Sequence, residues 1–328
     1  MGIHKSLLEL THIQAEKLIA FQHKRCSQNT SSEWVPKNFL LFIGGLGDSI
    51  LTVPYPSRIA ESLPPTWGLV EVMISSSATA FGCGSLKRDA DEIAECVKYF
   101  RSINPDGKVV LMGHSTGCQD LMQYLTGDAN KLHSKFEDER QERDDAGKRP
   151  RVHGAILQAP VSDREGIEVT GYDKNIFQQA ITLAESWVKD GKGEDCLPLG
   201  LTNQFFGPIP VNATRFLSLT LPGGDDDFFS SDLSDEMLAE TFGRIPKGTK
   251  LCVLYSGNDE YALPSIDKAG LIEKWKSHVE KSEGTFDEEH SDVIDNATHS
   301  LREERQDVPV EDCEIGRASC RERVCQYV

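Results

Sequence analysis

The sequence predicts an α/β fold in which a mostly parallel sheet is covered by helices on both faces. Two observations, both about the spacing of apolar residues, lead to this expectation. Apolar runs typical of buried strands occur at residues 39–43, 69–74, 109–112, 152–157 and 251–255. Amphipathic helical patterns lie between these runs, for example at residues 86–103 and 119–125. Buried strands that alternate with helices are typical of a parallel sheet with helices on both sides.

The composition is that of a globular protein with an acidic surface. The 328 residues are 38% hydrophobic and 27% charged, with a net charge of −17. Because an acidic surface repels phosphate backbones, we expect no nucleic-acid partner. No run approaches the roughly 20 apolar residues that cross a bilayer, and the N-terminus lacks a secretory pattern, so we expect no membrane insertion and a cytoplasmic location. The nine cysteines have no metal-like spacing and are expected to be free thiols.

Two segments interrupt the alternation of strands and helices. Residues 163–248 contain an amphipathic helix near residues 175–189, followed by turns rich in Pro, Gly and Asp. This block lies between two core strands and is expected to be a lid insertion. Residues 127–151 are almost wholly polar and are expected to form a surface insertion.

The C-terminal segment has an unusual sequence. Residues 314–324 read EIGRASCRERV, which matches a translated sequencing-adapter oligonucleotide. Segments of that origin are excluded from fold reasoning. We therefore expect a domain at residues 1–313 and a non-native tail at residues 314–328 that packs against nothing important, with a genuine basic tail as the alternative.

The strongest chemical signal is the segment KVVLMGHSTGCQDLMQYL around Ser115. An apolar strand runs into the turn GHSTG at residues 113–117, and a helical pattern follows. A nucleophile on a tight strand-to-helix turn needs small residues on both sides. The N-terminus of the next helix also favours negative charge that develops during a reaction. Ser115 is therefore the predicted nucleophile, with a plain glycine-rich turn as the alternative, and His114 is expected to point away from it and pack in the core.

A serine nucleophile needs a general base, and the base needs an acid that orients it. On a turn of this kind the chain order is serine, acid, histidine. The strand LCVLYS is followed by Gly-Asn-Asp, which places Asp259 at the carboxyl end of that strand, where ligand-facing residues gather in open α/β sheets. Asp259 is the predicted acid. Glu260 is its neighbouring rival, and a helix-capping role for Asp259 is the structural alternative.

Three histidines follow Asp259 in the chain. His278 lies in a helical run whose pattern indicates a solvated face, and His290 lies in an acidic run. His299 follows the apolar pair at residues 293–294, which is expected to end a last short strand. A loop in that position can bring a histidine over the nucleophile, so His299 is the predicted base and His290 the alternative.

The negative charge formed on the substrate needs two backbone N–H donors. One is expected from Thr116, the residue after the nucleophile, and the other from the loop after the first central strand. That loop is GGLGD at residues 44–48, whose glycines let the backbone approach a bound carbonyl closely. Leu46 is the predicted second donor. The loop matches neither glycine-rich phosphate-binding pattern, so we expect no nucleotide there.

Four segments carry a resemblance to a known family: FIGGLGDSILTVPY, FGCGSLKRDADEI, LMGHSTGCQDLMQYL and LQAPVSDREG. They resemble the α/β-hydrolase family that includes the fungal siderophore esterases, over about residues 36–301. The resemblance implies the α/β-hydrolase fold, an intracellular location and a triad of Ser115, Asp259 and His299. It also implies hydrolysis of siderophore esters such as those of fusarinine C and triacetylfusarinine C.

The motifs and the resemblance together predict a serine esterase that cleaves carboxylic esters through an acyl-enzyme. The expected substrate is a small-molecule ester of a hydroxamate siderophore such as fusarinine C, and no metal or organic cofactor is implied. Two alternatives stay open: a general carboxylesterase or thioesterase, and a ligand receptor on a hydrolase scaffold. Turnover of a simple aryl ester would separate an enzyme from a receptor.

Overall fold

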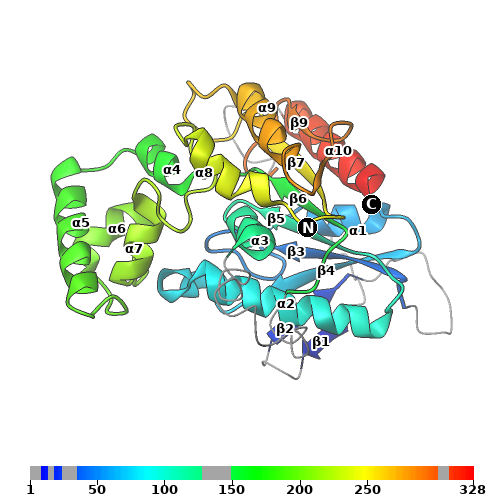
Figure 1. The fold of residues 1–328 in the computed structure, drawn as a ribbon, viewed down its shortest axis with the longest axis horizontal. Coiled ribbons are helices and arrows are strands. Elements are labelled where there is room, and N and C mark those ends of the chain that lie inside the picture. The colour runs from blue at the N-terminus through cyan, green and yellow to red at the C-terminus, as the bar shows by residue number, and fades with distance from the viewer. Residues whose placement is uncertain (1–8, 14–17, 24–34, 128–148, 302–309) are drawn as a thin grey trace, which may run out of the picture.

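A computed structural model of the protein describes residues 9–13, 18–23, 35–127, 149–301 and 310–328. At 9–13 and 310–317 it describes the backbone alone. Within these ranges the chain forms a nine-stranded sheet with helices on both sides (Figure 1). Most of the polar segment at residues 127–151, namely 128–148, lies outside the described residues, so its expected role as a surface insertion stays a prediction.

The strands follow the order β1-β2-β4-β3-β5-β6-β7-β8, and β9 also pairs with β7. All pairs from β4 to β9 are parallel, whereas β2 pairs antiparallel with both β1 and β4. The strands are β1 (Glu9–Ile13), β2 (Leu18–Gln22), β3 (Asn38–Ile43), β4 (Trp67–Met73), β5 (Val109–His114), β6 (Gly154–Gln158), β7 (Lys250–Ser256), β8 (Thr285–Phe286) and β9 (Asp292–Ile294).

The helices cover both faces of the sheet, because alternate side chains of the buried strands point to opposite sides. On β5, Val109 and Leu111 join the cluster under α2, α3 and α9, while Val110 and Met112 join the cluster under α1 and α10. The helices of these layers are α1 (Pro56–Ser62), α2 (Leu86–Ile103), α3 (Gly117–Thr126), α9 (Lys268–Val279) and α10 (Val310–Tyr327). A short 3-10 helix, η1 (Ala78–Cys83), precedes α2.

The predicted fold class is confirmed. The five expected buried strands correspond to β3 through β7, and the expected helices correspond to α2, α3 and α5. The apolar pair at residues 293–294 belongs to β9, as expected. The edge strands β1 and β8 and the strand β2, which lies next to β1, were not predicted.

A helical segment separates β6 from β7, at the place expected for the lid insertion. Its helices α5, α6 and α7 form a lobe beside the sheet, at the left of Figure 1, with a small apolar cluster of their own. Helix α8 instead contacts α9, next to the main core. The elements of this segment are α4 (Asp163–Thr170), α5 (Lys174–Lys189), α6 (Leu199–Phe206), α7 (Ala213–Thr220), α8 (Asp235–Glu240) and η3 (Phe242–Arg244).

The expectation that residues 314–328 pack against nothing important is wrong. They belong to α10, which contacts α1 and β9. Cys320 and Val324 are fully buried in the cluster on that face of the sheet. The Tyr327 hydroxyl donates a hydrogen bond to the carbonyl of Lys250. Cys320, Val324 and Tyr327 are four and three residues apart, so they form an apolar stripe on one side of a helix.

Candidate active site

Ser115 lies on the sharp turn between β5 and α3. Its backbone has φ +54°, a left-handed conformation that is uncommon for a residue with a side chain. A Cβ on Gly117 would lie 2.4 Å from the carbonyl oxygen of Ile43, so no larger residue fits there. The Ser115 N–H donates to the Gln158 carbonyl at 3.0 Å, which anchors the turn to β6. The left-handed backbone of Ser115 and the lack of space beside Gly117 are typical of a turn that presents a serine above the sheet edge.

Asp259 and His299 come together although they are 40 residues apart. The Nδ1 of His299 lies 3.0 and 2.9 Å from the two carboxylate oxygens of Asp259. Since a carboxylate only accepts, Nδ1 is the protonated nitrogen, and the neutral ring then has its lone pair on Nε2. Both side chains are buried. This geometry suits a base that is held in one tautomer by an acid.

The Asp259 carboxylate favours the protonated form of the His299 imidazole. Burial alone would lower the pKa of His299, but the facing Asp259 carboxylate outweighs it and raises the pKa above its ordinary value of 6.5. The ring of Tyr261 packs edge-on against the imidazole at a centroid distance of 4.7 Å. His299 is therefore confined by packing as well as by its hydrogen bond.

Glu260, the alternative acid, and His290, the alternative base, make contacts different from those of Asp259 and His299. Glu260 accepts a hydrogen bond from the backbone N–H of His299 at 2.8 Å, whereas Asp259 contacts the imidazole. His290 instead bonds Asp287 at 2.8 Å, and its ring faces Tyr327.

Two other histidines differ from expectation. His278 was expected on a solvated face of its helix, but it is buried in α9. His114 is buried, as expected, but it does not point away from the site. Its ring lies 5.0 Å from that of His299, and it lines the same cavity as Ser115. Burial and the neighbouring His299 lower the pKa of His114 to about 4, so it stays neutral near pH 7.

Ser115 and His299 line one open cavity of about 440 Å³. No hydrogen bond joins the Ser115 hydroxyl to His299 among the described residues, so the contact predicted between them is not formed in this structure. Such bonds commonly tighten only when substrate is bound. Three phenylalanines lie on the wall of the cavity, Phe81 of η1 and Phe205 and Phe206 of α6, and Tyr261 lines it next to His299. The helical lobe therefore contributes directly to the cavity.

Leu46 and Thr116 also line this cavity. In the loop of residues 44–48, the Gly45 N–H donates to the Asp48 carboxylate at 2.9 Å, and the Asp48 N–H donates to the Gly45 carbonyl at 3.0 Å. The N–H groups of Leu46 and Thr116 have no hydrogen-bond acceptor among the described residues. Both predicted donors are thus available for a bound carbonyl oxygen.

Sequence reasoning missed two residues that organise the site. Gln158, at the end of β6, accepts from the Tyr55 hydroxyl and from His114, and its amide nitrogen donates to the carbonyl of His299 at 3.3 Å. Asp48 holds the loop that carries Leu46. A polar residue at the carboxyl end of a buried strand was the available signal for Gln158.

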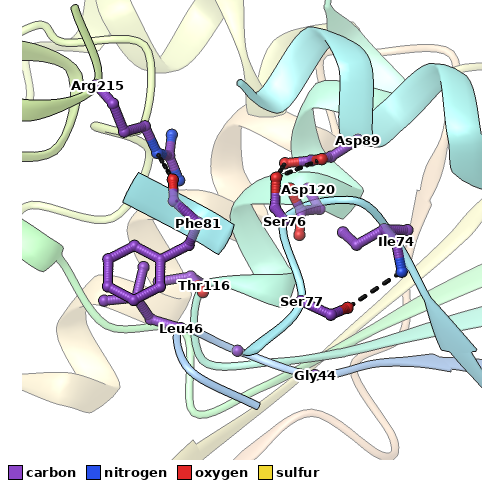
Figure 2. A pocket seen from close by; sticks show the side chains of 11 residues that line it. Gly44, Leu46, Ile74, Ser76, Ser77, Phe81, Asp89, Thr116, Asp120 and Arg215 are labelled. Atoms are coloured by element: carbon purple, nitrogen blue, oxygen red, sulfur yellow. Dashed lines mark hydrogen bonds between the residues drawn. The ribbon is translucent and has the colours of Figure 1, made fainter. Parts of the chain in front are cut away.

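A second, smaller cavity lies behind the loop of residues 44–48, and Figure 2 shows its lining. Four buried or nearly buried carboxylates gather around one arginine there and just beyond it. Arg215 pairs with Asp226 and also donates to the carbonyl of Phe81 at 3.2 Å (Figure 2). The other three carboxylates are Asp89, Asp120 and Asp163. Burial raises the pKa of Asp89 to about 6 and that of Asp163 to about 8.

The sheet order, the helical layers and the strand-to-helix turn define an α/β-hydrolase. Among the described residues, no helix is long and apolar enough to cross a membrane. The chain belongs to the family described as "Protein of unknown function (DUF1749)", which matches residues 1–313.

Two curated relatives are esterases by name. The chain is 35% identical to "Fusarinine C esterase sidJ" of Aspergillus fumigatus, with 92% of this chain and 91% of that protein aligned. It is also 35% identical to "Esterase AN6793" of Emericella nidulans, over 89% of this chain and 86% of that one. The match with the fungal siderophore esterase family, expected from the sequence motifs, is confirmed.

The solved structure "Siderophore hydrolase EstB from Aspergillus fumigatus" superposes with a TM-score of 0.79 at 32% identity, and covers 100% of this chain and 98% of that one. A protein titled "Alpha/Beta hydrolase fold protein of unknown function" matches with a TM-score of 0.52 at 18% identity over 88% and 87% of the two chains, which shows the fold alone. With its esterase relatives, the chain is a carboxylic ester hydrolase.

Proposed function

We propose that this protein hydrolyses the ester bonds of a hydroxamate siderophore such as fusarinine C through an acyl-enzyme on Ser115. The observation that carries the proposal is the Asp259–His299 pair, whose imidazole lines one cavity together with a serine on a strained strand-to-helix turn. The substrate class comes from the relatives, which are named for fusarinine C and for siderophore hydrolysis.

In the proposed mechanism, the Ser115 hydroxyl attacks the ester carbonyl while Nε2 of His299 takes its proton. Asp259 holds the imidazole through Nδ1 and stabilises its charged form. The N–H groups of Leu46 and Thr116 receive the oxyanion. His299 then returns the proton to the leaving alcohol, and a water molecule activated by the same nitrogen releases the acid.

The cavity supports a substrate of substantial size without anionic groups. Its lining includes the Asp48 carboxylate and, among the described residues, no lysine or arginine, while the raised pKa of Asp163, about 8, keeps that carboxyl group mostly neutral near pH 7. An ester that carries a free carboxylate would meet like charge there, whereas a neutral or cationic ester would not. We further propose that residues 163–248 act as a lid, since α6 supplies Phe205 and Phe206 to the cavity wall.

The test is a panel of ferric and iron-free hydroxamate siderophore esters beside short aryl esters. We expect hydrolysis of at least one siderophore ester, and a loss of roughly a millionfold in kcat for Ser115→Ala, by analogy with loss of other triad serines. Ser62, an exposed serine at the end of α1, offers a matched control, since Ser62→Ala leaves the site intact. Cleavage of aryl esters alone would refute the substrate, and residual activity in Ser115→Ala would refute the mechanism.

We also propose a cytoplasmic location. The seven cysteines whose side chains are described are all thiols, which suits a reducing compartment. Fractionation of cells that express the tagged full chain tests this proposal, and recovery in the culture medium would contradict it.

A further inference from the structure

Two exposed thiols meet at the junction between the sheet and the helical lobe. The sulfur atoms of Cys83, at the end of η1, and Cys196, between α5 and α6, lie 3.6 Å apart. The two residues are 113 positions apart in the chain, so the contact joins separate parts of the fold. A disulfide bond is about 2.05 Å long, so the sulfurs would approach by about 1.5 Å to form one.

The backbone at this junction is already fitted closely. The Asn212 N–H donates to the Gly82 carbonyl at 2.8 Å, and Asn212 also pairs with Cys196 in an isolated β-bridge. A Cβ on Gly82 would lie 2.0 Å from the Pro210 carbonyl oxygen. Cys83 and Cys196 are thus held on two backbone segments that both pack against residues 210–212, which favours pairing between them over pairing with distant thiols.

The two sulfurs are chemically unequal. Partial burial and the hydrogen bond with Cys83 raise the pKa of the Cys196 thiol, and the nearby Asp195 adds to the effect. Cys196 therefore loses its proton only at a higher pH than an ordinary thiol, which makes it the less suited of the two sulfurs to begin an attack. Cys83 is the sulfur suited to attack first, and Cys196 is suited to resolve the product.

We propose that Cys83 and Cys196 are a redox modification site, at which a low-molecular-weight disulfide such as oxidised glutathione forms a reversible bond that fixes the helical lobe to the hydrolase core. The Cys83 thiolate attacks one sulfur of oxidised glutathione, and one glutathione thiolate leaves. The Cys196 thiolate then attacks the Cys83 sulfur of the mixed disulfide, and the second glutathione leaves. Two protein thiols are oxidised, and one glutathione disulfide is reduced to two thiols.

The bond would connect two walls of the large cavity. Phe81, two residues before Cys83, lines the cavity from the core side, and Phe205 and Phe206 line it from the lobe. A disulfide at the junction would restrict any separation of these walls. This catalytic consequence rests on the proposed function, since it matters only where a bulky ester must enter beneath the lobe.

The first experiment detects the bond without any activity assay. The full chain is equilibrated in mixtures of oxidised and reduced glutathione, free thiols are blocked with N-ethylmaleimide, and disulfide-linked peptides are mapped by mass spectrometry. We expect a linked Cys83–Cys196 peptide that disappears with dithiothreitol. The buried Cys96 and Cys252 serve as internal controls and should be blocked only after unfolding. Glutathione adducts on Cys83 and Cys196 without a linked peptide would overturn the proposal.

The second experiment measures the tether by hydrogen exchange on the same samples. Exchange of the backbone amides at residues 208–220 should slow by at least about tenfold on oxidation, because local opening of the lobe is suppressed. Cys83→Ser and Cys196→Ser should each abolish that change and leave the reduced-state exchange as it is. Complete oxidation with unaltered exchange would refute the tether.

Oxidation should also reduce turnover of a bulky siderophore ester more than that of a short aryl ester. An equal effect of oxidation on the two esters, in protein that shows the linked peptide and the slowed exchange, would contradict the proposed function of the lobe. It would leave the redox site itself unaffected.

Discussion

The Asp259 carboxylate and the His299 imidazole decide at which pH a base is available. Only the neutral imidazole can accept a proton from Ser115, and the facing carboxylate raises the pKa of His299 above 6.5. We therefore expect kcat/KM to rise with pH through an apparent pKa above that value. Asp259→Asn removes the carboxylate charge and no longer fixes the proton on Nδ1 of His299. The rise of kcat/KM on the acidic side of the pH profile, its acid limb, should therefore move to lower pH, and kcat should fall by about 10⁴.

A pH profile of kcat/KM for an aryl ester checks this prediction. Glu260→Gln is the matched control, because Glu260 contacts the backbone N–H of His299 and not its ring. The charge of Glu260 also raises the pKa of His299, but less than that of Asp259, so Glu260→Gln should move the acidic side of the profile by less than Asp259→Asn does. An acid limb that does not move in Asp259→Asn would show that another group titrates.

Gln158 is expected to position the site without touching the reacting atoms. Gln158→Leu would leave the Tyr55 hydroxyl and His114 without their acceptor, at about 1–3 kcal/mol for each unpaired buried group. It would also release the carbonyl of His299. We expect kcat to fall at least about tenfold, together with a loss of stability measured by urea denaturation.

Gln119→Leu is the control for this variant. Gln119 is as buried as Gln158, but its side chain hydrogen-bonds Val161 and Asp163 rather than His299. It should lose stability with a smaller loss of kcat. Equal effects of the two variants on kcat would argue that Gln158 is an ordinary core residue.

Sequence reasoning reached the residues with a local signature and missed those without one. Ser115 is marked by the strand, turn and helix around it, and the chain order directs attention to Asp259 and His299. The side chain of Gln158 bonds residues that are 44 to 141 positions away in the chain, and the residues next to it in sequence do not indicate these partners. The side chain of His114 was misplaced for the same reason, because its direction depends on Gln158.

At the scale of elements, continuous apolar runs predicted β3 to β7 because both faces of those strands are buried. β2 is a five-residue strand near the sheet edge, and a run that short cannot be told from a turn of helix by its periodicity. Helix α10 was missed because its stripe of Cys320, Val324 and Tyr327 is surrounded by charged residues. Its resemblance to a sequencing adapter also led to its exclusion, and a non-native origin stays a prediction.

Removal of α10 is expected to destabilise the protein. Truncation after Cys313 exposes the side of the sheet that Cys320 and Val324 cover, and burial of such side chains is worth about 1.5–3 kcal/mol each. We expect the free energy of unfolding to fall by about 3 kcal/mol or more, measured by urea denaturation. Val324→Asp tests the same packing in the full chain.

Arg321→Ala provides the control, because Arg321 is exposed on α10. It should change the free energy of unfolding by less than about 0.5 kcal/mol. A melting temperature unaltered by the truncation would restore the expectation that this segment is an appendage.

At the scale of the whole molecule, a cluster of buried carboxyl groups around Arg215 lies where the core meets the helical lobe. Asp89 belongs to α2, Asp120 to α3 and Asp163 to α4, and all three act on Arg215 of α7. These four helices are separate in the chain and meet only through tertiary folding, so no local sequence pattern marks the cluster. Burial makes the charged forms of these carboxyls costly, and a single guanidinium cannot neutralise them all.

This cluster should make stability fall as the solution becomes more alkaline. Asp163 has a pKa of about 8 in the folded protein, against an ordinary value of 3.8. A group whose pKa is raised by folding stabilises the native state fully below its unfolded pKa and loses that contribution as pH rises through its folded pKa. Between pH 6.5 and 8, Asp163 binds more protons in the folded than in the unfolded chain. Its ionisation therefore lowers the free energy of unfolding by up to about 1.4 kcal/mol per pH unit.

Asp163→Asn should remove most of this slope. The amide oxygen of asparagine can still accept the hydrogen bond from Gln119, while the titrating charge is lost. Urea denaturation at about pH 6.5, 7.2 and 8, which span the titration of Asp163 evenly, measures the free energy of unfolding. The wild type and Asp163→Asn are compared at each pH. Asp106→Asn, at an exposed turn, is the charge-matched control and should keep the wild-type slope. His114, whose pKa is about 4 in the folded protein, titrates in this window only in the unfolded chain, and this contribution to the slope is the same in both proteins. Parallel slopes for the wild type and Asp163→Asn would mean that Asp163 is already ionised at pH 6.5, with Arg215 compensating its charge in full.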